Sequence, residues 1–246
     1  IDKEGNIEFD LKELDQLVKK HNIKALVLNN PNNPSGKVFT KKWVAEVNTI
    51  LKKQGAWLLI DEVYKELIFD RSQLPEFSIT DDNIIRIGSF SKSLSVPGLR
   101  IGYIAAPEEF ISRADLFNQH IQTCINSLSC HLVEHLDASV FHSFAAKCAA
   151  VYSERFDMIY RLFNDGKLKT LYSNASFYSM VDFGNHFKDG QQACDYLSSK
   201  LNVTAVPGLP YGYHFESYIR ICLTLPVEVL EDEFNLITNS LANEDI

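Results

Sequence analysis

Side chains that could do chemistry gather at three points of the first hundred residues, each directly after an apolar stretch that is predicted to be a strand. The first point is the run N-N-P-N-N-P-S-G at residues 29–36. The second begins with Asp61, and the third contains Lys92. Open parallel sheets bind ligands at the carboxyl ends of their strands, so three such endings on neighbouring strands predict one shared site.

The residue types at these points suit one kind of ligand. The amine of Lys92 could attack a carbonyl carbon. The hydroxyls of Ser89 and Ser91 and the guanidinium of Arg100 could bind a phosphate. The carboxylate of Asp61 could keep a ring nitrogen protonated, while amide and phenol groups hold a ring oxygen. Pyridoxal phosphate needs this combination, because its ring withdraws electrons only while its nitrogen is protonated.

The elements that must position these residues are apolar strands alternating with helical segments. The strands lack polar alternation, so we expect them to be buried on both faces, as in a parallel sheet covered by helices. This pattern predicts the α/β class. The predicted elements are strands at residues 24–29, 57–61, 84–89 and 102–106, and a helix at 40–53 with Thr40 as its N-cap.

From residue 107 onward the pattern changes, and long helical segments dominate. We predict an incomplete cofactor-binding large domain over residues 1–110 and a smaller α+β domain, including the connecting long helix, over residues 111–246. The predicted elements of this part are helices at 108–137, 141–164, 190–201 and 226–241, and strands at 177–183 and 217–222.

Four segments resemble the signature blocks of the class I/II aminotransferases, which are pyridoxal-phosphate enzymes of fold type I. Three of them are N-N-P-N-N-P-S-G at 29–36, D-E-V-Y at 61–64 and S-F-S-K-S-L-S-V-P-G-L-R-I-G-Y at 89–103. They follow the order of the family with similar separations. The fourth, Y-I-R-I at 218–221, resembles the segment that binds the substrate carboxylate. The resemblance covers essentially the whole chain and implies the cofactor pyridoxal 5'-phosphate.

The resemblance implies catalytic roles for three residues. Lys92 would form the Schiff base with the cofactor and carry a proton between the substrate Cα and the cofactor. Asp61 would pair with the ring nitrogen. Tyr64 and Asn33 would bind the ring hydroxyl, and Asn33 would also contact the substrate.

The remaining matches imply binding roles. Ser89 and Arg100 would bind the cofactor phosphate, with Ser91 as a weaker candidate for the same role. Arg220 would bind the α-carboxylate of the substrate through its guanidinium.

The expected activity is transamination between an amino acid and a 2-oxo acid in amino-acid metabolism, most similar by motif to the aspartate, aromatic and kynurenine-type subgroup. The resemblance also implies a homodimer. A decarboxylase or lyase on the same fold is an alternative, as is the aminotransferase-like sensor domain of a transcription regulator. A lysine aldolase without pyridoxal phosphate is disfavoured, because Asp61, Asn33 and Arg100 would then share no purpose.

A competing motif lies at residues 131–135, where H-L-V-E-H matches the H-x-x-E-H pattern of inverted zinc peptidases. Two histidines four residues apart on a helix share a face and could hold zinc. A five-residue match arises easily by chance, however, and the aminotransferase family has no metal in this region. We therefore expect no metal.

The composition favours a cytoplasmic protein without a nucleic-acid or membrane partner. The formal net charge is -8, whereas a general nucleic-acid binder needs a basic face. No apolar run approaches the roughly 18 residues of a membrane span. The five cysteines form no Cys-x-x-Cys pair, so we expect reduced and mostly buried thiols.

The first block already appears at residue 29, and the N-terminal part of the family has no counterpart in this chain. We therefore expect a fragment whose sheet lacks strands at both edges and which, alone, aggregates or binds cofactor weakly. Two departures from the family pattern leave the choice of substrate open. They are Asn174-Ala175, where the family often has Gly-Gly, and the extra proline Pro210.

Overall fold

The computed structural model consists of two compact units, and each is described by itself. The first unit contains Phe9–Asn32 and Val38–Ala149. The second contains Asn33–Lys37 together with the described parts of Ile1–Glu8 and Ala150–Ile246. The domain boundary between residues 110 and 111 stays a prediction. The structure describes residues 7–70, 72, 81–164 and 168–243.

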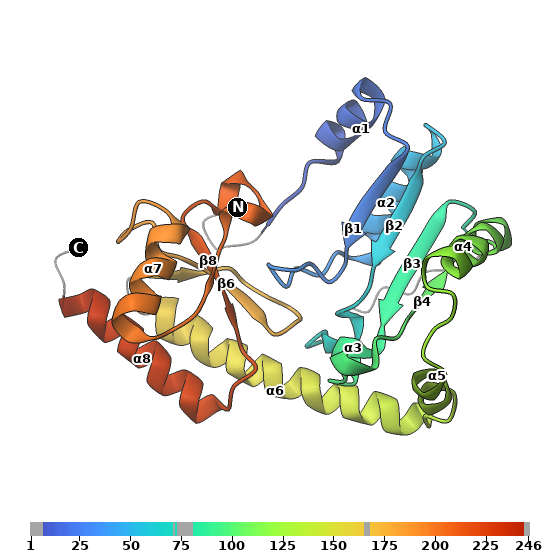
Figure 1. Ribbon diagram of the computed structural model, residues 1–246. Helices are drawn as coiled ribbons and strands as arrows, with labels where there is room; N and C mark the ends of the chain where they lie inside the picture. Colours follow the sequence, from blue (N-terminus) through green and yellow to red (C-terminus); the bar gives the residue numbers. More distant parts are fainter. Residues whose placement is uncertain (1–6, 71, 73–80, 165–167, 244–246) are drawn as a thin grey trace. The chain divides into compact units, whose positions relative to one another are not determined.

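The sheet of the first unit consists of β1 (Ala25–Asn29), β2 (Trp57–Asp61), β3 (Ile84–Ser89) and β4 (Gly102–Ala105), in that order (Figure 1). β1 pairs with β2 and β2 with β3 in parallel orientation, whereas β3 pairs with β4 in antiparallel orientation. The predicted α/β class with a mostly parallel sheet is therefore confirmed.

Two helices, α1 (Leu11–Lys20) and α2 (Lys41–Lys52), contribute to the core of the first unit. Thr40 caps α2 as predicted, because its side chain accepts a hydrogen bond from the Trp43 backbone N–H at 3.2 Å. The helix α1 has no counterpart among the elements predicted from the sequence. The core contains Val18, Leu28, Val44, Val47, Leu51, Leu58, Ile60 and Ile84.

The two faces of this sheet differ, because successive residues of a strand point to opposite sides. Leu28, Leu58 and Ile60 point to the face that belongs to the core, and each is at most 9% exposed. On the opposite face Val27 is 68% exposed and Ile104 is 45% exposed. The prediction of burial on both faces is therefore wrong for β1 and β4, whereas in β3 the consecutive residues Ile84 and Ile85, which point to opposite faces, are both buried.

The helical region predicted at 108–137 is two helices, α4 (Glu108–Ile121) and α5 (Ser127–Glu134). The chain turns between them, where Thr123 has a φ of 62°. Asn126 then starts α5, because its side chain accepts a hydrogen bond from the Ser129 backbone N–H at 3.0 Å. The other short helices of the first unit are α3 (Phe90–Ser93) and the 3-10 turns Lys65–Leu67 and Pro97–Leu99.

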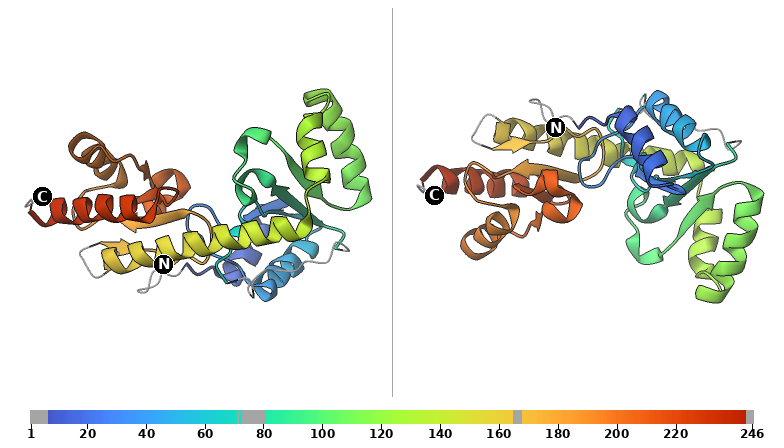
Figure 2. Two further views of the ribbon diagram at one scale, coloured as in Figure 1. Left: turned by 90° about the horizontal axis from the view of Figure 1, so that it is seen from below. Right: turned by 90° about the horizontal axis from the view of Figure 1, so that it is seen from above.

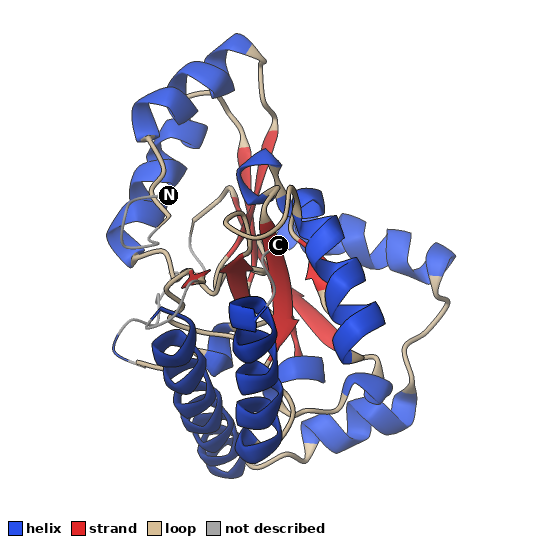
Figure 3. Cartoon of the chain, turned by 90° about the vertical axis from the view of Figure 1, so that its left-hand side faces the viewer, coloured by secondary structure: helices blue, strands red, loops and turns tan. Residues whose placement is uncertain are grey.

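The longest helix, α6 (Ala138–Asn164), starts three residues before the predicted helix and ends where predicted. α8 (Val227–Asn243) lies beside the carboxyl-terminal half of α6 (Figure 2, Figure 3). The rings of Phe163 and Phe234 join these two helices, with their centroids 5.2 Å apart. None of the described helices, α6 included, combines the length and apolarity that a membrane span requires.

The second unit contains an antiparallel sheet with the strand order β5-β6-β8-β7, which confirms the predicted strands near 177–183 and 217–222. Large apolar side chains such as Phe156, Phe183 and Ile219 are fully buried in this unit. Its elements are β5 (Lys169–Thr170), β6 (Tyr178–Asp182), α7 (Gly190–Leu201), β7 (Val206–Pro207), β8 (Tyr218–Cys222) and the 3-10 turns Leu209–Tyr211 and Tyr213–Phe215.

The five cysteines are free, as expected, but most of them are not buried. Cys194 is buried, and this burial, followed by the charge of Asp195, raises the pKa of its thiol to about 11. The expectation of mostly buried thiols is wrong because several lie in turns, at a strand end or on half-covered helix faces. Cys130 and Cys148 are half-buried, and Cys124 and Cys222 are exposed.

Within the second unit, the loop 33–37 is held in place at Gly36. The Gly36 carbonyl accepts a hydrogen bond from the Asn174 backbone N–H at 3.1 Å. A Cβ atom at Gly36 would lie 1.8 Å from the Ser173 Oγ and 2.6 Å from the Ala175 carbonyl oxygen. The φ of Gly36 is also +68°. Only glycine therefore fits at this point of the motif.

We predict that Gly36→Ala lowers the free energy of unfolding by about 2–5 kcal/mol, since overpacking adds to the cost of a positive φ. Gly55→Ala is the matched control, because Gly55 also has a positive φ of +60° but no atom within 4 Å of its Cβ position. That control should cost only about 1–2 kcal/mol. Urea denaturation followed by circular dichroism measures both, and equal losses would contradict the steric argument.

Candidate functional site

The carboxyl ends of β1, β2 and β3 lie at the same edge of the sheet, as predicted. The register pairs Asn29 with Asp61 and Asp61 with Ile87. Paired residues in a sheet point to the same face, and so does Ser89, two residues beyond Ile87. The pairing therefore brings Asp61 and Ser89 together on the face of the sheet opposite the core. Ser89 is the first residue of the segment 89–103, which contains Lys92.

Asp61 is half-buried, and its side chain is oriented by the backbone that follows it. One carboxylate oxygen, Oδ1, accepts a hydrogen bond from the Val63 backbone N–H at 3.1 Å. The Asp61 carbonyl accepts from the Asn30 backbone N–H at 2.9 Å and from the Asn29 side chain at 3.2 Å. The carboxylate is thus held in a turn at the strand end rather than at the start of a helix.

The segment 89–103, which contains Lys92, begins with a helix N-cap at Ser89. The Ser89 hydroxyl accepts a hydrogen bond from the Ser91 backbone N–H at 3.1 Å and donates to the Ile101 carbonyl at 3.3 Å. This cap starts α3, the short helix that carries Lys92. Lys92 and Ser91 are both half-buried. Because Ser89 already donates to a carbonyl, a phosphate would have to replace that contact.

Arg100 and Tyr64, which both belong to the first unit, differ in their exposure to solvent. Arg100 is exposed, has a φ of 52° and donates from its guanidinium to the Pro97 carbonyl at 3.1 Å. Its exposed guanidinium can reach an anion in solvent. Tyr64 is 5% exposed, so its ring is packed in the interior.

Asn33 and Arg220 belong to the second unit, and the structure brings them together. The Arg220 guanidinium donates to the Asn33 side-chain oxygen at 3.2 Å. It also lies over two aromatic rings, 4.2 Å from the centroid of Tyr178 and 5.1 Å from that of Tyr211. The two rings fix the plane of the guanidinium through cation–π contacts.

The sequence analysis missed Tyr178 and Tyr211 as partners of Arg220. Tyr178 lies in the strand predicted at 177–183, just after the segment that lacks the usual Gly-Gly. Tyr211 follows the extra proline Pro210. Tyr178 lies on β6, which pairs with β8, the strand that carries Arg220. Its contact with Arg220 could have been predicted only if the register that places Met180 opposite Arg220 were known.

A buried ion pair lies on the core face next to Asp61 and was also missed. Arg86 donates from Nε to Glu62 Oε1 at 3.0 Å and from a terminal nitrogen to Oε2 at 2.7 Å. The side chain of Glu62 is 1% exposed and that of Arg86 is 15% exposed. Nearby, burial is the main cause that raises the pKa of Tyr103, followed by the charge of Glu62.

The donor set fits pyridoxal phosphate chemically. The first unit holds an amine, a carboxylate, a phenol, hydroxyls and an exposed guanidinium, which are the groups that this cofactor requires. They come from two neighbouring strand ends and the segments that follow. In the second unit, an amide and a guanidinium contact each other. The role of each residue toward a cofactor stays a prediction.

Comparison with known proteins places the chain among aminotransferases. The family model "Aminotransferase class I and II" matches residues 1–232. The probable aspartate aminotransferase of Methanocaldococcus jannaschii is 28% identical, over 96% of this chain and 63% of that protein. Aromatic-amino-acid aminotransferase 2 of Thermococcus litoralis is 25% identical, over 94% of this chain and 60% of that protein. The chain thus spans about three fifths of the length of these relatives.

Solved structures show the same fold. The aromatic aminotransferase from Pyrococcus horikoshii matches with a TM-score of 0.88 at 24% identity, covering 96% of this chain and 64% of that one. An aspartate aminotransferase of Thermus thermophilus matches with a TM-score of 0.85 at 21% identity, covering 94% of this chain and 63% of that one.

We predict that Glu62→Ala lowers the free energy of unfolding by about 3–5 kcal/mol, because it leaves the Arg86 charge buried without its partner. The double variant Glu62→Leu/Arg86→Met should lose less, since it removes both charges. Glu109→Ala serves as the control, because it breaks an ion pair whose side chains are 82% and 80% exposed. That control should cost less than about 1 kcal/mol. Urea denaturation decides, and a double variant as unstable as Glu62→Ala would contradict the argument.

Proposed function

Because the chain belongs to the class I and II aminotransferase family, we propose that it transfers the amino group of an amino acid to a 2-oxo acid with pyridoxal phosphate. The observation that carries this proposal is the strand-end arrangement around Lys92. This lysine follows β3 directly, and the neighbouring strand β2 ends at Asp61 on the same edge of the sheet. The names of the relatives, which include aspartate and aromatic aminotransferases, support the same reaction class.

The residues that would hold the cofactor follow from their chemistry. Lys92 would bind its aldehyde carbon through the amine, and Asp61 would bind its ring nitrogen. When bound, pyridoxal phosphate supplies an aldehyde that condenses with amines and a protonated ring that accepts electrons from a bond at the substrate Cα. The remaining proposed ligands are Asn33 and Tyr64 for the ring hydroxyl, and Ser89, Ser91 and Arg100 for the phosphate.

Lys92 would also act on the proton. When it is not bound to the cofactor, its amine would be the base that takes the proton from the substrate Cα and would return it to the aldehyde-derived carbon of the cofactor. Asp61 would maintain the positive charge of the ring, because a carboxylate next to a protonated nitrogen favours the charged form. The turn that holds its Oδ1 on the Val63 N–H fixes the direction of this carboxylate.

Arg220 would orient the substrate. A guanidinium binds a carboxylate through two parallel N–H donors, so its plane sets the direction of the substrate Cα. Tyr178 and Tyr211 lie over that guanidinium, and Asn33 accepts one of its N–H groups at 3.2 Å. The amino donor, a homodimer and a cytoplasmic location remain proposals at the level of the family resemblance.

We expect Lys92→Ala to abolish the absorbance band of the lysine-bound cofactor and to lower the rate of amino transfer by several orders of magnitude, since the base is lost. Lys12→Ala, which alters an exposed lysine of α1, is the control and should retain both. Absorbance spectra and a coupled assay, both on the full-length protein loaded with cofactor, measure the effect. Retention of band and turnover in Lys92→Ala would move the function to another residue.

Arg220→Ala should raise the KM for the amino acid roughly 10- to 100-fold with a smaller effect on kcat, because a charged hydrogen-bonded contact is worth about 1.5–3 kcal/mol. Arg161→Ala is the control, because Arg161 is an exposed arginine that bonds its own helix. Steady-state kinetics with varied amino acid measures the two constants. An unchanged KM would place the carboxylate site elsewhere.

A further inference from the structure

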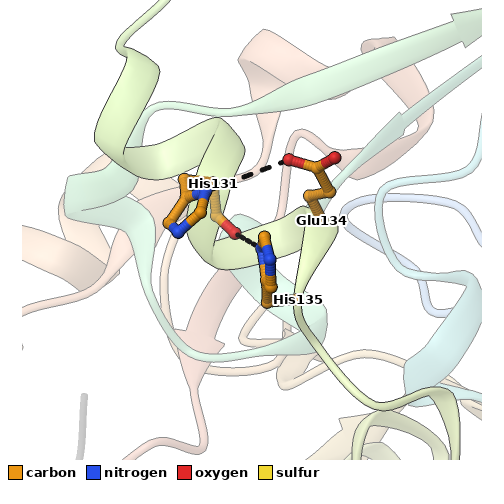
Figure 4. A group of neighbouring side chains, drawn as sticks. All are labelled: His131, Glu134 and His135. Carbon is orange, nitrogen blue, oxygen red and sulfur yellow. Dashed lines mark hydrogen bonds and ion pairs between the residues drawn. The ribbon is translucent and has the colours of Figure 1, made fainter.

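Three potential metal ligands gather at the carboxyl end of α5 and at its C-cap residue, where the function proposed above assigns no role (Figure 4). They are His131, Glu134 and His135, and all three are exposed. One ligand atom of each lies within 4.8 Å of those of the other two. None of them is among the residues proposed to bind cofactor or substrate.

The helix places the three side chains on one face, because residues three and four positions apart are neighbours on a helix surface. The His131 Nδ1 lies 3.9 Å from the Glu134 carboxylate. The ring centroids of His131 and His135 are 4.1 Å apart. The three residues of the H-x-x-E-H pattern at 131–135 that could bind a metal are therefore neighbours in space.

The orientation of His135 favours metal binding. Its Nδ1 lies 2.9 Å from the His131 carbonyl oxygen, which can only accept, so Nδ1 carries the proton and donates. The lone pair of the neutral ring is then on Nε2, the outer nitrogen. Metal-binding histidines commonly donate their second ring nitrogen to a backbone carbonyl in this way, which fixes the tautomer and the ring direction.

The helix that carries the cluster is anchored at its start. Asn126 caps it through the Ser129 backbone N–H, at 3.0 Å. The Ser129 hydroxyl, which belongs to a residue only 3% exposed, donates to the Leu99 carbonyl at 2.9 Å. The backbone of the three ligands is thus held in place while their side chains remain open to solvent.

We propose that His131, Glu134 and His135 bind one divalent transition-metal ion, with zinc as the representative. Metal–ligand bonds of about 2.0–2.2 Å require the three ligand atoms to approach one another by roughly 1 Å, which exposed side chains can do by rotation. Two imidazoles favour zinc, copper or nickel over magnesium or calcium. Three protein ligands leave the fourth position of a tetrahedral ion to water or to another donor.

The test is titration of the purified chain with zinc chloride by isothermal calorimetry, after treatment with a chelator. The background is Cys124→Ser/Cys222→Ser, because these two exposed thiols would also bind zinc. We expect one ion per chain. His131→Ala and His135→Ala should each weaken binding at least tenfold, and Glu134→Gln should weaken it less. Unchanged binding in both histidine variants would overturn the proposal, as would the absence of binding in the parent.

Two controls keep the result specific. His120→Ala and His214→Ala remove exposed histidines outside the cluster and should leave zinc affinity unchanged. Two-dimensional NMR of the imidazole nitrogens should show that zinc shifts Nε2 of His135 while Nδ1 keeps its proton. A shift at Nδ1 instead would contradict the proposed geometry. Amino transfer plays no part in either readout, so the site and the proposed enzymatic function fail or stand separately.

Discussion

The register of the parallel strands β1, β2 and β3 is the constraint on which the candidate site depends. Asn29 and Asp61 are 32 residues apart in the chain, and their alignment exists only because their strands pair. The hydrogen bonds continue one residue past the strands, from Asn30 N–H to the Asp61 carbonyl and from Glu62 N–H to the Ile87 carbonyl, at 2.9 and 2.8 Å. The strand ends are therefore fixed where the chemistry is placed.

Two of the proposed ligands, Asn33 and Arg220, belong to the second unit. After Asn32 the chain passes into the second unit, where Gly36 meets residues 173–175 and Asn33 meets Arg220. Asn33 and Arg220 are 187 residues apart in sequence. The motif at residues 29–36 is therefore continuous in sequence but divided between the two units. Gly36 is required because neighbouring atoms of residues 173–175 approach it closely, and not only because the chain turns there.

Much of the fold could be predicted because the strands carry a local signal. The limits of β2 and β3 agree with their predicted limits, since mostly apolar runs end there at polar residues. The break between α4 and α5 was not predicted, because the residue with a left-handed conformation there is Thr123 and not a glycine, which would have indicated a turn. The exposure of Val27 was also missed, since burial depends on what covers a face and not on the strand itself.

In the site, too, the residues could be predicted from local sequence motifs, whereas their contacts depend on folding. Lys92, Asp61 and Arg220 could be proposed from their motifs. The contacts that orient them could not, because the cation–π contacts of Arg220 arise from residues brought near only by folding. The ion pair Glu62–Arg86 likewise joins two strands across 24 residues.

The alternation of side chains along the strands couples stability to chemistry. In β2 the residues Leu58 and Ile60 face the core, and the ion-paired Glu62 continues this series. Leu59 and Asp61 face the other way, toward the candidate site. A slip of one residue in the register would place Asp61 in the core and Ile60 in the site. The burial of the core residues and the Glu62–Arg86 pair both oppose such a slip, so the interactions that stabilise the sheet also determine which side chains can meet a ligand.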